Sequence, residues 1–165
     1  MANSPSSQRN KRFHPFRKKW GQNFLRDPNT IGKILDCLNP DKGDIILEIG
    51  PGDGALTDCL SPLVKEIHDV EIDPLLVKLL EEKIYPNVKL YGEDILDWDM
   101  NRMSGNIKII GNLPYYISSP ILFKLLESNN WTQMVLMFQK EVAQRIVSHP
   151  CSKSYSRLSV MSQVF

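Results

Sequence analysis

An α/β fold with a parallel sheet is the fold class that the sequence predicts. Short, nearly continuous apolar runs bounded by turn residues alternate with longer segments of helical periodicity. Such runs are typical of strands buried on both faces, and their alternation with helices indicates βαβ units. The length of 165 residues suits one domain, and 42% hydrophobic with 24% charged residues is typical of a soluble globular protein.

The first elements follow from their boundaries. Asp27 suits a helix N-cap and Pro28 the first helical position. A turn containing Pro, Asp and Gly ends this helix, and a glycine-rich stretch ends the strand that comes next. These boundaries predict a helix over 29–38, a turn over 39–43, a strand over 44–49 and a helix over 55–63.

The same alternation continues to the end of the chain. It predicts strands over 66–72, 88–91, 107–111 and 133–138, and helices over 74–84, 120–128 and 141–148. A last apolar helical segment, with Leu158, Val160, Met161 and Val164, stops without a cap or a polar tail. This ending predicts a fragment of a longer protein, with its domain incomplete at the C-terminus.

Composition excludes several classes of protein. Apolar runs such as 134–138 are far shorter than the roughly 20 residues that span a bilayer, so no membrane association is expected. Three cysteines without a CxxC pair argue against a disulfide framework or a zinc knuckle, and favour a reducing cytoplasm. The three histidines lack ligand spacing, so no metal site is expected.

Charge is distributed unevenly along the chain. Residues 1–26 contain seven basic residues and no acidic one, which leaves 13 basic and 19 acidic residues and a net charge of −6 for the rest. We predict a basic, flexible arm over 1–20 that contacts nucleic acid, followed by one domain over 21–165. A solvated tail and an acid-free transit peptide are the alternatives.

A glycine-rich turn, Gly50-Pro51-Gly52-Asp53-Gly54, follows the first predicted strand. Glycines such as Gly50 and Gly52 permit positive φ and let a ligand approach the backbone closely. The GxGxG spacing differs from the dinucleotide GxGxxG, and the preceding Glu48 suits a positively charged sulfonium better than a pyrophosphate. A tight strand-to-helix turn without a ligand is the alternative.

Two acidic residues follow the next two strands. Glu71 lies 21 residues after Gly50, where a carboxylate can accept both hydroxyls of a ribose. Asp73 competes for this role, and strand alternation is expected to place only one of the two inward. Asp94, after the third strand, can accept a hydrogen bond from an adenine amine. Each acid alone can also be a surface residue, but three strand ends in a row favour a ligand site.

The most specific motif is Asn112-Leu113-Pro114-Tyr115, after the fourth strand. A methyl-transfer enzyme that acts on an adenine amine faces a poor nucleophile, because the lone pair of this nitrogen is delocalised into the ring. The Asn112 side-chain oxygen and the Leu113 carbonyl can accept its hydrogens, Pro114 can stiffen the loop, and Tyr115 can stack on the base. A proline turn with buried aromatics is the alternative. Phe138 can face the same base, although core packing is the favoured interpretation.

Several segments, in this order, match one enzyme family. They are Gly21 to Leu25, Glu48 to Gly54, Val70 to Asp73, Asp94, Asn112 to Pro120, Gln139 to Val142 with Arg145, and Tyr155 to Val160. Over 18–165 the chain resembles the ribosomal RNA adenine dimethyltransferases, and most closely the bacterial branch that dimethylates two adjacent adenosines near the 3′ end of small-subunit rRNA.

The resemblance implies a Rossmann-like class I methyltransferase sheet and S-adenosylmethionine as cofactor. In that family the sheet has seven strands and a small helical domain follows, so this chain is expected to be truncated before the last strands and that domain. The cofactor positions that carry over are Asn23, Leu25, Gly50, Glu71, Asp94 and Asn112.

The resemblance also implies a function and a partner. The expected reaction is methyl transfer to the N6 amines of two adjacent adenosines, by a monomer acting on small-subunit rRNA in a pre-ribosomal particle in the cytoplasm. Lys140, Arg145 and Arg157 are either RNA contacts or solvated charges. Three alternatives remain: a large-subunit rRNA methyltransferase conferring antibiotic resistance, which typically has Ile where Leu113 stands; a non-catalytic nucleic-acid-binding relative; and a nucleotide-dependent oxidoreductase.

Overall fold

A computed structural model describes residues 24–128 and 130–164. The predicted arm over 1–20 and the predicted cofactor residue Asn23 lie outside these residues. The elements are α1 (Pro28–Leu38), β1 (Ile45–Ile49), α2 (Ala55–Leu60), β2 (Glu66–Val70), α3 (Pro74–Glu81), β3 (Val88–Tyr91), the 3₁₀ helix η1 (Met100–Arg102), β4 (Ile107–Asn112), α4 (Ser118–Ser128), β5 (Gln133–Met137), α5 (Lys140–Ile146) and α6 (Arg157–Val164).

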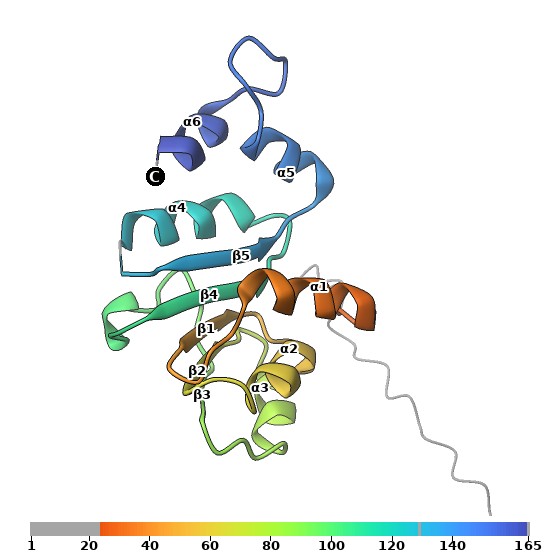
Figure 1. Ribbon diagram of the computed structural model, residues 1–165, viewed down its shortest axis with the longest axis vertical. Helices are drawn as coiled ribbons and strands as arrows, with labels where there is room; N and C mark the ends of the chain where they lie inside the picture. Colours follow the sequence, from red (N-terminus) through yellow and green to blue (C-terminus); the bar gives the residue numbers. More distant parts are fainter. Residues whose placement is uncertain (1–23, 129, 165) are drawn as a thin grey trace, which may run out of the picture.

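The five strands form one parallel sheet in the order β3-β2-β1-β4-β5 (Figure 1). The predicted fold class is therefore confirmed. The chain first adds strands on one side of β1 and then crosses to its other side with β4, so the strand order reverses between β1 and β4. In open α/β sheets, ligands bind outside the carboxyl ends of the strands at such a reversal.

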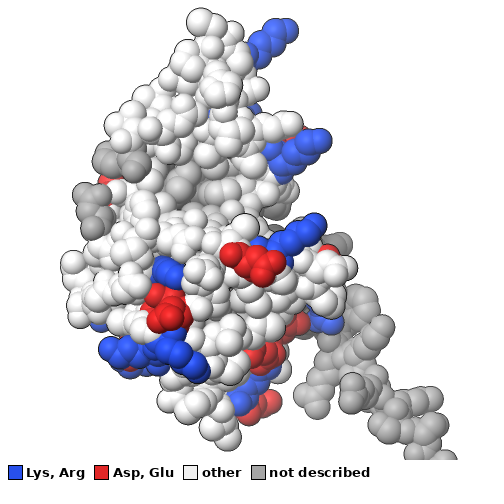
Figure 2. All heavy atoms as spheres, viewed as in Figure 1, with Lys and Arg blue, Asp and Glu red and all other residues white. Residues whose placement is uncertain are grey.

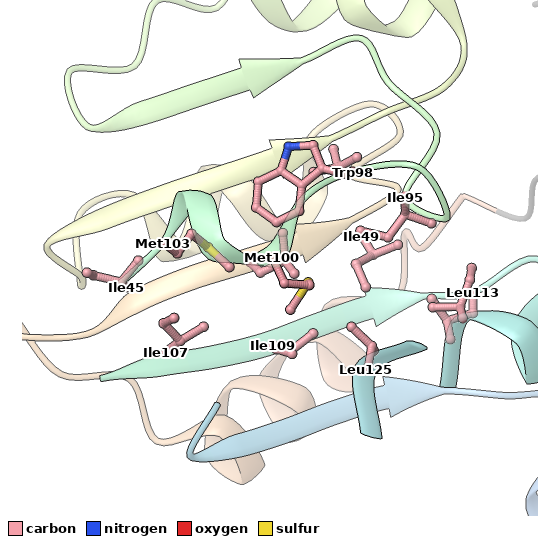
Figure 3. Close-up of a cluster of buried hydrophobic side chains, with 13 residues drawn as sticks. Ile45, Ile49, Ile95, Trp98, Met100, Met103, Ile107, Ile109, Leu113 and Leu125 are labelled. Atoms are coloured by element: carbon pink, nitrogen blue, oxygen red, sulfur yellow. The ribbon is translucent and has the colours of Figure 1, made fainter. Parts of the chain in front are cut away.

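Each face of the sheet carries its own apolar core. One core gathers β-strand side chains with α1 and α2, and it includes Ile34, Leu38, Ile46, Leu56, Leu60 and Ile67. On the other face Trp98 and Met100, from the irregular segment after β3, pack with Ile49, Ile109 and Leu125 (Figure 3). Trp98 is fully buried, so this segment between β3 and β4 closes the sheet although it contains little regular structure.

The structure shifts several predicted boundaries. Helix α2 ends at Leu60 rather than at 63, since Pro62 offers no backbone N–H to continue it. Strand β2 ends at Val70 rather than at 72, and the Asp73 side chain caps α3. Helix α3 ends at Glu81 rather than at 84. Among residues 24–128 and 130–164, no helix is long and apolar enough to cross a membrane.

Candidate active site at the carboxyl end of the sheet

A cleft of about 240 Å³ opens where the strands end. It is lined by segments that follow each of the five strands, together with the residues that lead into α1. Every predicted site residue within the described part of the chain contributes to its wall: Leu25, Gly50, Gly52, Glu71, Asp94, Asn112, Leu113, Pro114 and Tyr115. Residues separated by up to 90 positions in the sequence thus share one cavity.

The glycine-rich turn forms the cleft floor with its backbone in the left-handed region. Gly50 and Gly52 have φ of 66° and 63°. A Cβ at Gly52 would lie 3.1 Å from the Phe24 ring, so a side chain there would be both strained and crowded. The Gly52 amide donates to Glu71 Oε2 at 3.2 Å, which ties the turn to the end of β2.

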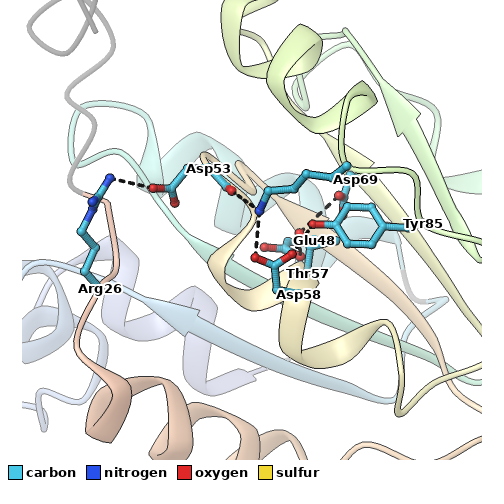
Figure 4. Close-up of polar contacts among 8 residues, drawn as sticks. Arg26, Glu48, Asp53, Thr57, Asp58, Asp69 and Tyr85 are labelled. Carbon is cyan, nitrogen blue, oxygen red and sulfur yellow. Dashed lines mark hydrogen bonds and ion pairs between the residues drawn. The ribbon is translucent and has the colours of Figure 1, made fainter. Parts of the chain in front are cut away.

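The segment before α1 folds over this turn. Arg26 lies over the Phe24 ring, 5.8 Å from its centroid, and its guanidinium pairs with Asp53 at 2.8 Å (Figure 4). The resemblance implies a cofactor role for Leu25, whereas Phe24 was not predicted to belong to the site. Both residues line the cleft, because the Arg26–Asp53 contact holds their segment beside the glycine turn.

The two competing acids after β2 have different surroundings. Only Glu71 of the two lines the cleft, as expected, but strand alternation is not the reason, because residues two apart share a face and both acids are buried. The Asp73 carboxylate accepts the Leu75 amide and caps α3, whereas Glu71 lies in the cleft wall. Glu71 accepts the Asp73 and Gly52 amides, and burial raises its pKa despite these bonds.

Asp94 is fixed by a turn of its own. Its Oδ1 accepts the Leu96 amide at 2.9 Å, and its carbonyl accepts the amides of Asp97 and Trp98. The buried Trp98 thereby anchors the position of the Asp94 side chain at the cleft. Burial, with a smaller contribution from the Asp94 charge, raises the pKa of the neighbouring Tyr116.

The Asn112 to Tyr115 loop continues directly from β4. Leu113 is buried and its amide donates to the Met137 carbonyl at 3.3 Å, which holds the loop against the end of β5. Tyr115 and Tyr116 are 57% and 47% exposed and meet edge to face with centroids 5.9 Å apart. The alternative of a proline turn with buried aromatics does not describe this loop, because its aromatic rings are presented to the cleft.

Comparison with known proteins identifies the family of this chain. The sequence profile of the family described as ribosomal RNA adenine dimethylase matches residues 13–165. The chain belongs to the ribosomal RNA adenine dimethylase family. It is 44% identical over 152 residues to the ribosomal RNA small subunit methyltransferase A of Aromatoleum aromaticum, covering 91% of this chain and 57% of that protein.

Two solved structures extend the comparison. The dimethyladenosine transferase from Plasmodium falciparum superposes with a TM-score of 0.78 at 32% identity, over 87% of this chain and 53% of that one. The 23S rRNA methyltransferase ErmE gives 0.72 at 31% identity, over 85% and 55%. The chain thus spans less than two thirds of the length of each of these three relatives.

In this member of the dimethylase family, Phe138 fits both interpretations that the sequence left open. It lines the cleft and also packs against the apolar cores. Lys140 and Arg145 are exposed on α5, and Arg157 lies over the Phe123 ring at 5.5 Å. Within the described residues, no group of His, Cys, Asp or Glu side chains is arranged to hold a metal ion.

Sequence reasoning did not predict Tyr116 in this cleft, nor the burial of Glu48. Tyr116 lines it beside Tyr115, and a run of two tyrosines after a proline was a signal that could have found it. Glu48 also lines the cleft but is only 2% exposed, and it accepts a hydrogen bond from Thr57. Burial raises the pKa of Glu48 to about 7, well above the pKa of a solvated glutamate side chain.

Proposed function

We propose that this chain transfers methyl groups from S-adenosylmethionine to the N6 amines of two adjacent adenosines near the 3′ end of small-subunit rRNA. One observation carries the proposal. The groups suited to a nucleoside cofactor, from Gly50 to Asp94, and the amine-polarising loop from Asn112 to Tyr115 line a single cleft. A cofactor and a target base held there would be in contact, which is what direct group transfer requires.

The residues present fit the cofactor. The left-handed backbone of Gly50 and Gly52 leaves the turn free of side chains, so a ligand can approach it closely. Glu71 uses one lone pair on each oxygen for a backbone amide, and a carboxylate retains further acceptor positions for two ribose hydroxyls. When bound, the cofactor supplies an electrophilic methyl group.

The loop after β4 acts on the target amine. The Asn112 side-chain oxygen and the Leu113 carbonyl accept its two hydrogens and draw the nitrogen toward tetrahedral geometry. The exposed Tyr115 ring stacks on the extruded base. The amine proton becomes acidic once the nitrogen is alkylated, so positioning and polarisation suffice and no strong base is needed.

The names of the relatives favour the small-subunit substrate. The Aromatoleum aromaticum protein carries that substrate in its name, and its 44% identity exceeds the 31% shared with ErmE, which is named for 23S rRNA.

We further propose a monomer that meets its RNA in a pre-ribosomal particle, with the basic arm over 1–20 contacting phosphates. The free thiols of Cys37, Cys59 and Cys151 support a cytoplasmic location.

The test is methyl transfer by the purified chain to small ribosomal subunits that lack the dimethylation, with large-subunit rRNA as the competing substrate. Nucleoside mass spectrometry should find dimethyladenosine in the small-subunit RNA only. Transfer to large-subunit RNA alone would identify the resistance-type enzyme. Cofactor binding without transfer to either RNA would identify a non-catalytic relative, and both results would contradict the proposal.

A further inference from the structure

Two buried carboxyl groups meet at one hydroxyl beneath the cleft. Glu48 on β1 and Asp69 on β2 are register partners, and their side chains point to the same face of the sheet toward Thr57 on α2 (Figure 4). Thr57 Oγ1 lies 2.9 Å from Glu48 Oε2 and 3.4 Å from Asp69 Oδ2. Asp69 is fully buried, and its Oδ1 has no hydrogen-bond partner.

The hydrogens at this junction can be counted. A threonine hydroxyl has one proton and can donate to one acceptor. The shorter distance assigns that proton to Glu48, so the contact between Thr57 and Asp69 is a hydrogen bond only if Asp69 carries a proton and donates it. Two ionised carboxylates here would leave one of them facing a lone pair in a buried site, which is costly.

The charged groups around Glu48 and Asp69 do not neutralise two ionised carboxylates. Glu71 lies on the cleft side, and Asp58 on α2 adds further negative charge. The one basic group near the pair, among the described residues, is Lys83, which is held by the Asp53 carbonyl and by Asp58 Oδ2. Tyr85 donates to Asp58 Oδ1, while the strand neighbours Ile110 and Leu90 are apolar. Burial raises the pKa of both Glu48 and Asp69.

We propose that Asp69 and Glu48 share one proton through Thr57, and that binding of the cationic cofactor at the cleft expels this proton to solvent. Glu48 links the pair to the cleft, because it lines the cleft wall above the shared hydroxyl. A sulfonium and an ammonium group nearby favour the second ionised carboxylate. In this step the carboxylic O–H bond breaks, the proton passes to the buffer, and the pair gains one negative charge.

This inference rests on the proposed function for the charge of its ligand, S-adenosylmethionine. It makes cofactor affinity depend on pH. Each proton released per binding event raises the affinity about 10-fold per pH unit, over the range in which the free pair holds the proton. The release should approach one proton near pH 6 and decline above pH 7, where burial has placed the Glu48 titration.

The experiment is calorimetry of S-adenosylmethionine binding to the full chain, in two buffers of different ionisation enthalpy at pH 6.5. The difference in binding heat counts the released protons. Wild type and Thr57→Ser should release a large fraction of one proton. Asp69→Asn should release a clearly smaller fraction, because only one of the two carboxyl groups that share the proton remains. Asp36→Asn, at an exposed acid on α1, is the matched control and should behave like wild type.

The outcomes separate this inference from the proposed function. Cofactor binding without proton release, or undiminished release in Asp69→Asn, would overturn the inference and leave the function standing. Absence of cofactor binding by wild type would instead contradict the proposed function. Infrared spectroscopy of the free wild-type chain tests the shared proton without any variant. A protonated-carboxyl band should be present at pH 6 and decrease on cofactor addition, and its absence in the free chain would refute the sharing.

Discussion

Buried acids have opposite surroundings at the two ends of the sheet. At the amino end, Asp44 is 1% exposed and both of its oxygens are matched by donors. Oδ2 pairs with Lys108 at 2.7 Å and accepts the Asp41 amide, and Oδ1 accepts from Asn106 at 2.7 Å. At the carboxyl end, Glu48 and Asp69 share one hydroxyl.

The comparison distinguishes a buried acid that stabilises the fold from buried acids that lie beside the candidate ligand site. The donors around the buried Asp44 fix the loop before β1 to β4. Clustered acids with too few donors keep protons that they would lose in water, and such perturbed groups collect at functional sites. A third pattern is that of partly exposed ion pairs such as Arg102–Glu93 and Lys89–Glu66. Figure 2 shows acidic and basic side chains lying close together on the surface.

The largest effect is expected at the amino end of the sheet. Asp44→Ala leaves the Lys108 ammonium, whose side chain is only 13% exposed, without its carboxylate. Removing one partner of a buried pair costs about 3–5 kcal/mol, so the free energy of unfolding should fall by about this amount. Urea denaturation measures it, and Asp36→Ala on the surface of α1 is the control. A loss below about 1 kcal/mol would show that Asp44 is not a stabilising pair.

The acids at the carboxyl end should make stability depend on pH with the opposite sign to paired acids. Burial raises the pKa of Glu48 to about 7, so the folded chain holds a proton that the unfolded chain loses above about pH 4.5. The free energy of unfolding should therefore fall as pH rises from 4.5 to 7, by on the order of 3 kcal/mol, and then level off.

This pH effect is isolated by comparison with Asp69→Asn. Burial lowers the pKa of His68, which makes a contribution of opposite sign near pH 6, and that contribution is common to both proteins. Wild type should lose more stability than the variant between pH 5 and 7.5 in urea denaturation. Parallel pH profiles would contradict the proposal that Glu48 and Asp69 hold a shared proton in the folded chain.

Asn112 extends the comparison from stability to chemistry. Asn112→Ala removes one proposed acceptor for the target amine and leaves the glycine turn and Glu71 in place. Methyl transfer at saturating cofactor should fall by about 100-fold, as when one preorganised polar group is lost from other active sites. Single-turnover transfer to undermethylated small subunits measures it, and an unchanged rate would remove Asn112 from the mechanism.

Local signals allowed most of the fold to be predicted. The Asp27 cap and Pro28 gave the start of α1, and apolar runs gave all five strands to within two residues at each end. Polar residues directly after those runs predicted the candidate site, because parallel strands bring their carboxyl ends to one end of the sheet. The nine predicted residues that the structure describes do line one cleft.

What was missed depends on packing between distant segments. The buried state of Asp69 follows from the position of α2 over β1 and β2, which no local pattern specifies. The clasp of Lys83 on the Asp53 carbonyl joins residues 30 apart, and the Arg26–Asp53 pair joins residues 27 apart. The fully buried Trp98 lies in an irregular segment, where neither helical nor strand periodicity marks it.

The smallest of these effects is expected at the cofactor wall, where Glu71 and Arg26 offer a matched pair of changes. Glu71→Ala removes charge-assisted hydrogen bonds to the proposed ribose, which should weaken S-adenosylmethionine binding by about 10- to 100-fold, or roughly 1.5–3 kcal/mol. Arg26→Ala removes an exposed ion pair, its side chain being 67% accessible, and such pairs contribute at most about 1 kcal/mol. Its effect on affinity should therefore stay within about 5-fold. Calorimetry of both variants, with folding checked by thermal denaturation, decides between them. Equal losses would mean that the Arg26–Asp53 ion pair matters as much for cofactor affinity as the buried Glu71 carboxylate. An unchanged affinity in Glu71→Ala would remove that carboxylate from the cofactor site.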